Sequence, residues 1–162
     1  MDKQERDALI EEYGAGYSKL KACLDSLPRA MWQFKPAPTE WSVHEIIVHL
    51  ADSESNSALR ARRLIVEPGQ SVMAYDQDVW ANGLNYHAQN WEDALETVRL
   101  VRKSTYELLK MQPEDVWTHA ATHPEFSDPY TFERWLKIYA GHIPGHIEQI
   151  RGNEKAWKEQ NK

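Results

Sequence analysis

Apolar residues recur at steps of three and four along most of the chain, and no segment shows the two-residue alternation of a half-buried β-strand. The pattern predicts four long helices, which cover about residues 3–27, 42–67, 90–111 and 131–152. Residues 66–90 join the second helix to the third and are numerous enough for a crossover. We therefore predict an all-α fold, a four-helix bundle with a long crossover-type connection between helices 2 and 3.

The predicted helix ends depend on capping residues and on glycine. Ser42 and Glu45 form a capping box at the start of the second helix, where each side chain accepts a hydrogen bond from an unpaired backbone N–H. The last helix is predicted to end at Gly152, and the polar segment after it is expected to fray. We predict a single domain over residues 1–152, followed by a polar tail over residues 153–162.

The composition limits the classes of partner and ligand. The chain has 162 residues, of which 41% are apolar, and its formal net charge is −6, so we expect neither a nucleic acid nor a membrane surface as partner. The start of the chain lacks an apolar signal segment, and no apolar run is long enough to span a membrane, which predicts a cytoplasmic protein. The single cysteine, Cys23, excludes a disulfide framework, whereas seven histidines offer nitrogen ligands for a metal ion.

Two histidines of the last helix are candidates for such ligands. His142 and His146 are four residues apart, so that both imidazoles can address one point on the apolar side of the helix. Burying an unpaired imidazole costs about 1–3 kcal/mol, which favours a bound partner. Chance alone gives about 0.3 pairs at this spacing among seven histidines, so the spacing by itself is weak evidence. The other histidines except His49 are interpreted as surface or loop residues: His44, His87, His119 and His123.

The second helix carries polar residues where a purely structural bundle would carry leucine. His49 borders the apolar stripe, and Glu54 falls inside it, where a carboxylate needs a cationic or hydrogen-bonding partner. His49 could join the histidine pair in a three-histidine site, with open positions for water or substrate. The alternative for both residues is structural, with His49 satisfied by a hydrogen bond and Glu54 bonded to a neighbouring side chain or to the backbone.

Two segments resemble the DinB-like superfamily of metal-binding four-helix bundles: WSVHEIIVHLADSE in the second helix and TFERWLKIYAGHIPGHIEQI in the last. The resemblance covers nearly the whole chain. It implies that His49, His142 and His146 bind the metal ion, which in this family is usually zinc or nickel. Pro144-Gly145 departs from the continuous helix that would suit the site, because proline removes a backbone hydrogen bond and is predicted to kink the helix.

The resemblance also implies a function, because characterised members of the family include thiol-dependent transferases and isomerases. A divalent ion on neutral ligands would activate a low-molecular-weight thiol, as co-substrate, or a water for attack on a small electrophilic substrate. Glu54 and Tyr139 are candidates for orienting a ligand or transferring a proton. The resemblance mildly favours a homodimer. The alternative function is that of a non-catalytic bundle with a vestigial site, acting as a stress-related ligand-binding or interaction protein.

Overall fold

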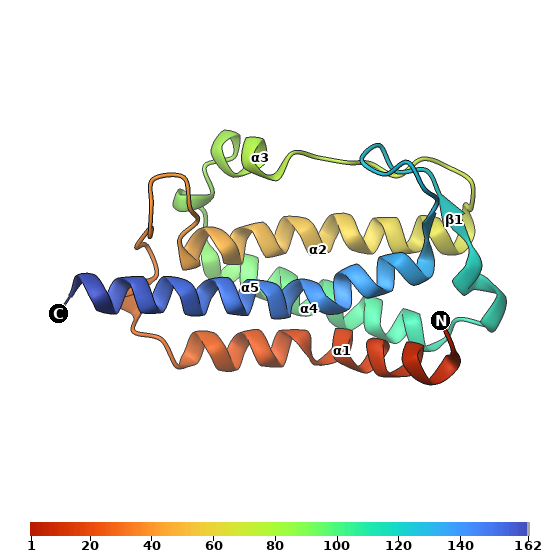
Figure 1. The fold of residues 1–162 in the computed structure, drawn as a ribbon, viewed down its shortest axis with the longest axis horizontal. Helices are drawn as coiled ribbons and strands as arrows, with labels where there is room; N and C mark the ends of the chain where they lie inside the picture. Colours follow the sequence, from red (N-terminus) through yellow and green to blue (C-terminus); the bar gives the residue numbers. More distant parts are fainter. Residues whose placement is uncertain (162) are drawn as a thin grey trace.

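Four long helices make up most of the computed structural model, which describes residues 1–161 (Figure 1). They are α1 (Lys3–Asp25), α2 (Val43–Val66), α4 (Trp91–Lys110) and α5 (Phe132–Gln160). The connections contain η1 (Arg29–Met31), α3 (Gln77–Gly83), η2 (Tyr86–Ala88), η3 (Glu114–Thr118) and two short strands, β1 (Ala120–Ala121) and β2 (Tyr130–Thr131). The strands pair antiparallel and close the loop that precedes α5.

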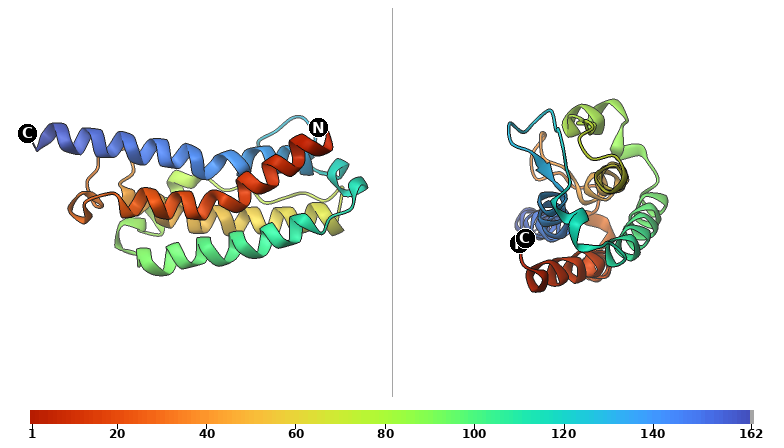
Figure 2. Two further views of the ribbon diagram at one scale, coloured as in Figure 1. Left: turned by 90° about the horizontal axis from the view of Figure 1, so that it is seen from below. Right: turned by 90° about the vertical axis from the view of Figure 1, so that its right-hand side faces the viewer.

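Consecutive long helices do not all lie side by side. Both α1 and α2 pack against α4 and α5, so α1 and α2 lie diagonally opposite each other, as the end-on view shows (Figure 2). In Figure 1, α1 and α5 run in one direction and α2 and α4 in the other, so the two most extensive contacts join parallel helices. A parallel pair needs a connection that returns along the bundle, and residues 67–90 provide it. The predicted bundle with a crossover between its second and third helices is confirmed.

The starts of the helices agree with the capping residues in the sequence. The Ser42 side chain accepts from the Glu45 backbone N–H, and the Glu45 carboxylate accepts from the Ser42 N–H. Side chains of Asn90 and Thr131 cap α4 and α5 in the same way. Each cap satisfies backbone donors that no preceding turn can reach.

The predicted end of the last helix at Gly152 is wrong, because α5 continues to Gln160. Two contacts with distant parts of the chain hold this extension. The Asn153 side-chain amide donates to the Trp41 carbonyl at 2.8 Å, and Trp157 packs against the apolar core. α5 also runs through Pro144 without a break.

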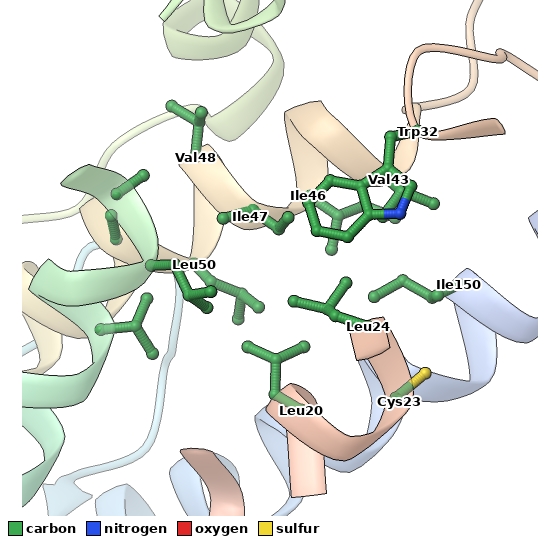
Figure 3. Close-up of a cluster of buried hydrophobic side chains, with 14 of the residues drawn as sticks. Leu20, Cys23, Leu24, Trp32, Val43, Ile46, Ile47, Val48, Leu50 and Ile150 are labelled. Atoms are coloured by element: carbon green, nitrogen blue, oxygen red, sulfur yellow. The ribbon is translucent and has the colours of Figure 1, made fainter. Parts of the chain in front are cut away.

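The interior consists of two apolar clusters at opposite ends of the bundle. Figure 3 shows the first cluster, which includes Leu20, Leu24, Ile46, Leu50 and Ile150. The second cluster includes Tyr13, Leu64, Trp117, Phe132 and Trp135. Along each long helix, one half faces the first cluster and the other half faces the second. The polar residues of the candidate site lie at the level where the two clusters meet. Within residues 1–161, no helix has both the length and the apolar character needed to cross a bilayer.

Candidate metal centre

Three histidines from two neighbouring helices converge between α2 and α5. His49 comes from α2, and His142 and His146 come from successive turns of α5, which packs against α2. Each offers one ring nitrogen, and the three nitrogens lie within 4.8 Å of one another. The structure thus brings together the three residues that the sequence suggests as ligands. His142 and His146 lie on one continuous helix, although Pro144 stands between them.

The arrangement of the ring nitrogens fits a single divalent ion. Two nitrogens bound to one zinc ion at tetrahedral positions are about 3.4 Å apart, given metal–nitrogen distances of about 2.0–2.1 Å. The Nε2 atoms of His142 and His146 are 3.3 Å apart. Both ring nitrogens of His49 are buried and have no hydrogen-bond partner in the described part of the chain, and the same holds for Nδ1 of His142. A bound ion would satisfy one of the two His49 nitrogens, and a buried nitrogen without a partner otherwise costs about 1–3 kcal/mol.

The surroundings keep the imidazoles of His49 and His146 neutral, which is the form that binds a metal ion. Burial lowers the pKa of His49 to about 2, and the nearby rings of His146 and His142 add to the effect. Burial and the neighbouring His142 lower the pKa of His146 to about 4. The Trp41 ring packs on His49 at 4.6 Å between ring centroids, and Nδ1 of His146 lies 2.9 Å from the Gln149 side-chain oxygen. That contact leaves Nε2 of His146 directed at the other histidines.

Glu54 is completely buried beside this cluster and is paired. Its Oε1 accepts from the Arg102 guanidinium at 2.5 Å, and its Oε2 accepts from the Tyr13 hydroxyl at 3.3 Å. Arg102 also donates to the carbonyl oxygens of Tyr13 and Tyr139. Burial by itself would raise the pKa of Glu54, but the charge of Arg102 and the contacts with His142 and Tyr13 together outweigh burial and lower the pKa below its ordinary value. We call these three residues, Tyr13, Glu54 and Arg102, the ion-pair layer.

The ion-pair layer also contacts the histidines. Oε1 of Glu54 lies 3.6 Å from Nδ1 of His142. A carboxylate behind a histidine fixes the orientation of the ring and makes its other nitrogen a better ligand. The sequence indicates that Glu54 needs a cationic or hydrogen-bonding partner, and the structure identifies Arg102, which lies 48 residues away.

A pocket of about 600 Å³ opens next to the histidines. Its lining includes His49 and His142 at one end and Tyr139 and Arg60 further along. The Tyr139 hydroxyl accepts a hydrogen bond from Arg60 at 2.9 Å. Burial raises the pKa of Tyr139, so that its hydroxyl keeps its proton at neutral pH. The sequence analysis suggests Tyr139 as a candidate but misses Arg60. The signal that could have identified Arg60 is its spacing of 11 residues from His49, which places both residues on one face of α2.

Two of the histidines predicted to be solvent-exposed are buried. His44 faces the turn before α4, where Nε2 lies 2.8 Å from the Gln89 carbonyl oxygen. His123 packs between the rings of Phe126 and Tyr130, because residues 117–130 fold back on the bundle. Both rings therefore have partners within the fold, unlike the buried nitrogens of His49.

Known proteins share both the sequence pattern and the fold. The model of the DinB superfamily matches residues 12–150. The "Putative metal-dependent hydrolase YfiT" of Bacillus subtilis (strain 168) is 22% identical over 150 residues, which are 93% of this chain and 84% of that protein. The "Putative metal-dependent hydrolase OB0782" of Oceanobacillus iheyensis is 31% identical over 111 residues, which are 68% of this chain and 63% of that protein.

The fold similarity extends over almost the entire molecule. A solved structure of YfiT from Bacillus subtilis, reported as "a probable metal-dependent hydrolase with an unusual four-helix bundle topology", matches this chain with a TM-score of 0.89 at 21% sequence identity. The match covers 98% of this chain and 90% of that chain. At this level of identity the match shows that the two proteins share a fold.

Proposed function

This chain belongs to the DinB superfamily, and we propose that it is a metal-dependent enzyme that activates a water or a thiol for attack on a small electrophilic substrate. The observation that carries the proposal is the set of buried, unpaired histidine nitrogens beside an open pocket. A purely structural core would have filled this position with apolar side chains or paired each nitrogen. The names of the relatives, which describe metal-dependent hydrolases, agree with this function.

His49, His142 and His146 would hold the metal ion, for which zinc or nickel is the proposed identity. When bound, a divalent ion on three neutral ligands lowers the pKa of a water or thiol, so that the nucleophile forms near neutral pH. Three protein ligands leave positions open for that nucleophile and for the substrate. Gln149 lies against Nδ1 of His146 and so directs its Nε2 toward the other histidines, and the carboxylate of Glu54 lies 3.6 Å from Nδ1 of His142.

The pocket provides the remaining functions. Its volume of about 600 Å³ suits a small molecule rather than a polymer chain. Tyr139 lines it with a hydroxyl that stays protonated, so Tyr139 can donate a hydrogen bond or a proton to a leaving group. In hydrolysis the hydroxyl of water adds to the electrophilic centre and a proton passes to the leaving group; in thiol transfer the sulfur takes the place of the hydroxyl.

Metal content tests the proposal first. We expect about one zinc or nickel ion per chain by elemental analysis after dialysis, and loss of the ion in His49→Leu and His146→Ala. His87→Ala is the matched control, because His87 is half-exposed and lies outside the cluster. It should keep the metal ion.

Activity then separates the two nucleophiles. Hydrolysis of p-nitrophenyl acetate by the metal-loaded chain tests whether water is the activated nucleophile. Conjugation of 1-chloro-2,4-dinitrobenzene with added 2-mercaptoethanol tests whether a thiol is. We expect at least one of the two activities, and its loss in His49→Leu. A protein that takes up neither zinc nor nickel would contradict the proposal, and would favour the non-catalytic bundle with a vestigial site.

A further inference from the structure

The pocket beside the histidines contains a cation, Arg60, that no carboxylate within residues 1–161 neutralises. Arg60 and His49 lie on the same face of α2, about 16 Å apart along the helix axis at a rise of about 1.5 Å per residue. Both line the same pocket. A ligand that fills the pocket would therefore contact the histidine cluster at one end and Arg60 at the other.

The hydrogen bonds of Arg60 hold its guanidinium in place and leave donors free. Nε and Nη2 donate to the Met73 carbonyl oxygen at 3.0 and 2.6 Å, and Nη1 donates to the Tyr139 hydroxyl at 2.9 Å. A guanidinium has five N–H donors, so one on Nη1 and one on Nη2 remain unused. Within residues 1–161, no carboxylate oxygen lies within 4.0 Å of an Arg60 nitrogen. Arg102, in contrast, is paired with Glu54.

Two carboxylates, Asp76 and Glu125, line the pocket, and neither is paired with Arg60. Asp76 caps the short helix α3, where its Oδ1 accepts from the backbone N–H groups of Asp78 and Val79. Glu125 is exposed in the loop before α5. Neither forms an ion pair with Arg60 across the pocket. The charge of Arg60 is thus available to a ligand.

We propose that Arg60 binds an anionic group of the substrate, such as a carboxylate, and so selects acidic substrates for the metal centre. Its role in substrate selection rests on the proposed function, whereas anion binding rests on the pocket alone. The guanidinium is fixed through Met73 and Tyr139 and keeps one donor on Nη1 and one on Nη2, and hydrogen bonds from a guanidinium to a carboxylate are strengthened by the two charges. Because Arg60 also donates to Tyr139, a bound anion would lie next to the hydroxyl that we assign to proton transfer.

Two ligands of nearly equal shape test the proposal. The full-length chain is titrated calorimetrically with 3-phenylpropionate and with 3-phenylpropanamide at neutral pH and low ionic strength, both zinc-loaded and zinc-free. We expect the acid to bind about tenfold more tightly than the amide, as a charge-assisted hydrogen bond predicts. Arg60→Gln should remove this preference. Arg63→Gln should keep it, since Arg63 lies on the same helix but outside this pocket, paired with Glu67.

The zinc-free titration separates the two sites. A preference for the acid that depends on Arg60 but not on zinc supports the anion site. A preference that requires zinc and survives Arg60→Gln places the carboxylate at the histidines and overturns the proposal, as does equal or absent binding of the two ligands by the zinc-free wild type. Failure to take up either zinc or nickel contradicts the proposed function alone, because the metal-free titration is unaffected. Unfolding temperatures of both variants confirm that each is folded.

Discussion

The ion-pair layer and the histidine cluster are adjacent polar groups that differ in whether their buried polar atoms are hydrogen-bonded. In the ion-pair layer, Arg102 is bonded to Glu54 and to two backbone carbonyls, and Glu54 also accepts from Tyr13. In the histidine cluster, both nitrogens of His49 are buried without a partner. The two regions meet at the 3.6 Å contact between Glu54 and His142.

The difference distinguishes polar groups that belong to the fold from polar groups that await a ligand. Buried polar atoms in proteins are nearly always paired, so a satisfied network by itself indicates structure. Buried nitrogens without partners lower the stability of the metal-free protein, and they persist where a ligand recovers that loss on binding. The comparison therefore predicts opposite responses to mutation in the two regions.

Breaking the ion-pair layer should have the largest effect. Arg102→Met leaves the carboxylate of Glu54 buried and unpaired, and we expect the free energy of unfolding to fall by about 3–5 kcal/mol in urea denaturation. The double variant Arg102→Met, Glu54→Met should regain most of this loss. Arg99→Met is the control, because Arg99 forms an exposed pair with Glu96 that contributes little. A loss below about 1 kcal/mol for Arg102→Met would show that the layer is not the fully paired element described above.

The histidine cluster should make the stability of the metal-free protein depend on pH. The pKa of His49 falls from 6.5 in the unfolded chain to about 2 in the folded one, so below about pH 6.5 the unfolded state binds a proton that the folded state does not. Stability is then fully present above about pH 6.5 and decreases on acidification by about 1.4 kcal/mol per pH unit. Urea titrations between about pH 7 and pH 4.5 measure the slope. His146, whose pKa is lowered to about 4, adds a comparable slope over this range, so His49→Leu should remove about half of the total slope. An unchanged slope in that variant would contradict the assignment.

Close packing of the ion-pair layer gives a smaller expected effect. A Cβ on Gly16 would lie 2.7 Å from Nε of Arg102, which is held by three other contacts. We expect Gly16→Ala to destabilise the protein by about 1–2 kcal/mol, because overpacking exceeds the gain in helix propensity. Gly152→Ala, with nothing within 4 Å of the new Cβ, should instead stabilise it by about 0.5–1 kcal/mol. Thermal unfolding that ranks the two variants the other way round would contradict this packing.

Features that depend on neighbouring residues could be predicted from the sequence. The capping box of Ser42 and Glu45 is formed within one turn, so the start of α2 agrees with the structure. Spacing alone places His142 and His146 on one side of α5, and the wheel position of His49 places it at the border of the core. These periodic and local signals were enough for the bundle and left both a ligand and a structural role open for His49. The resemblance to the DinB-like superfamily implied the set of three histidines, whose role as ligands stays a prediction.

Features that depend on distant residues could not be predicted. α5 continues past Gly152 because Asn153 bonds to the Trp41 carbonyl, 112 residues away. His123 is buried by a loop whose path no periodicity describes. The sequence indicates that Glu54 needs a partner, but it does not show which of the Lys and Arg residues lies next to Glu54 in the fold. In each case the missing information is which segments meet in three dimensions.

The parallel pairing of α1 with α5 has a consequence for how the molecule is made. α1 leaves the ribosome before α5 and finds its most extensive partner only when α5 has been synthesised. Contacts between such distant segments slow folding relative to a bundle of sequential hairpins, and a nascent chain that stops before α5 exposes the apolar faces of three helices. Because two of the three histidines also lie on α5, the proposed metal site is completed only after α5 has been synthesised, together with the core of the bundle.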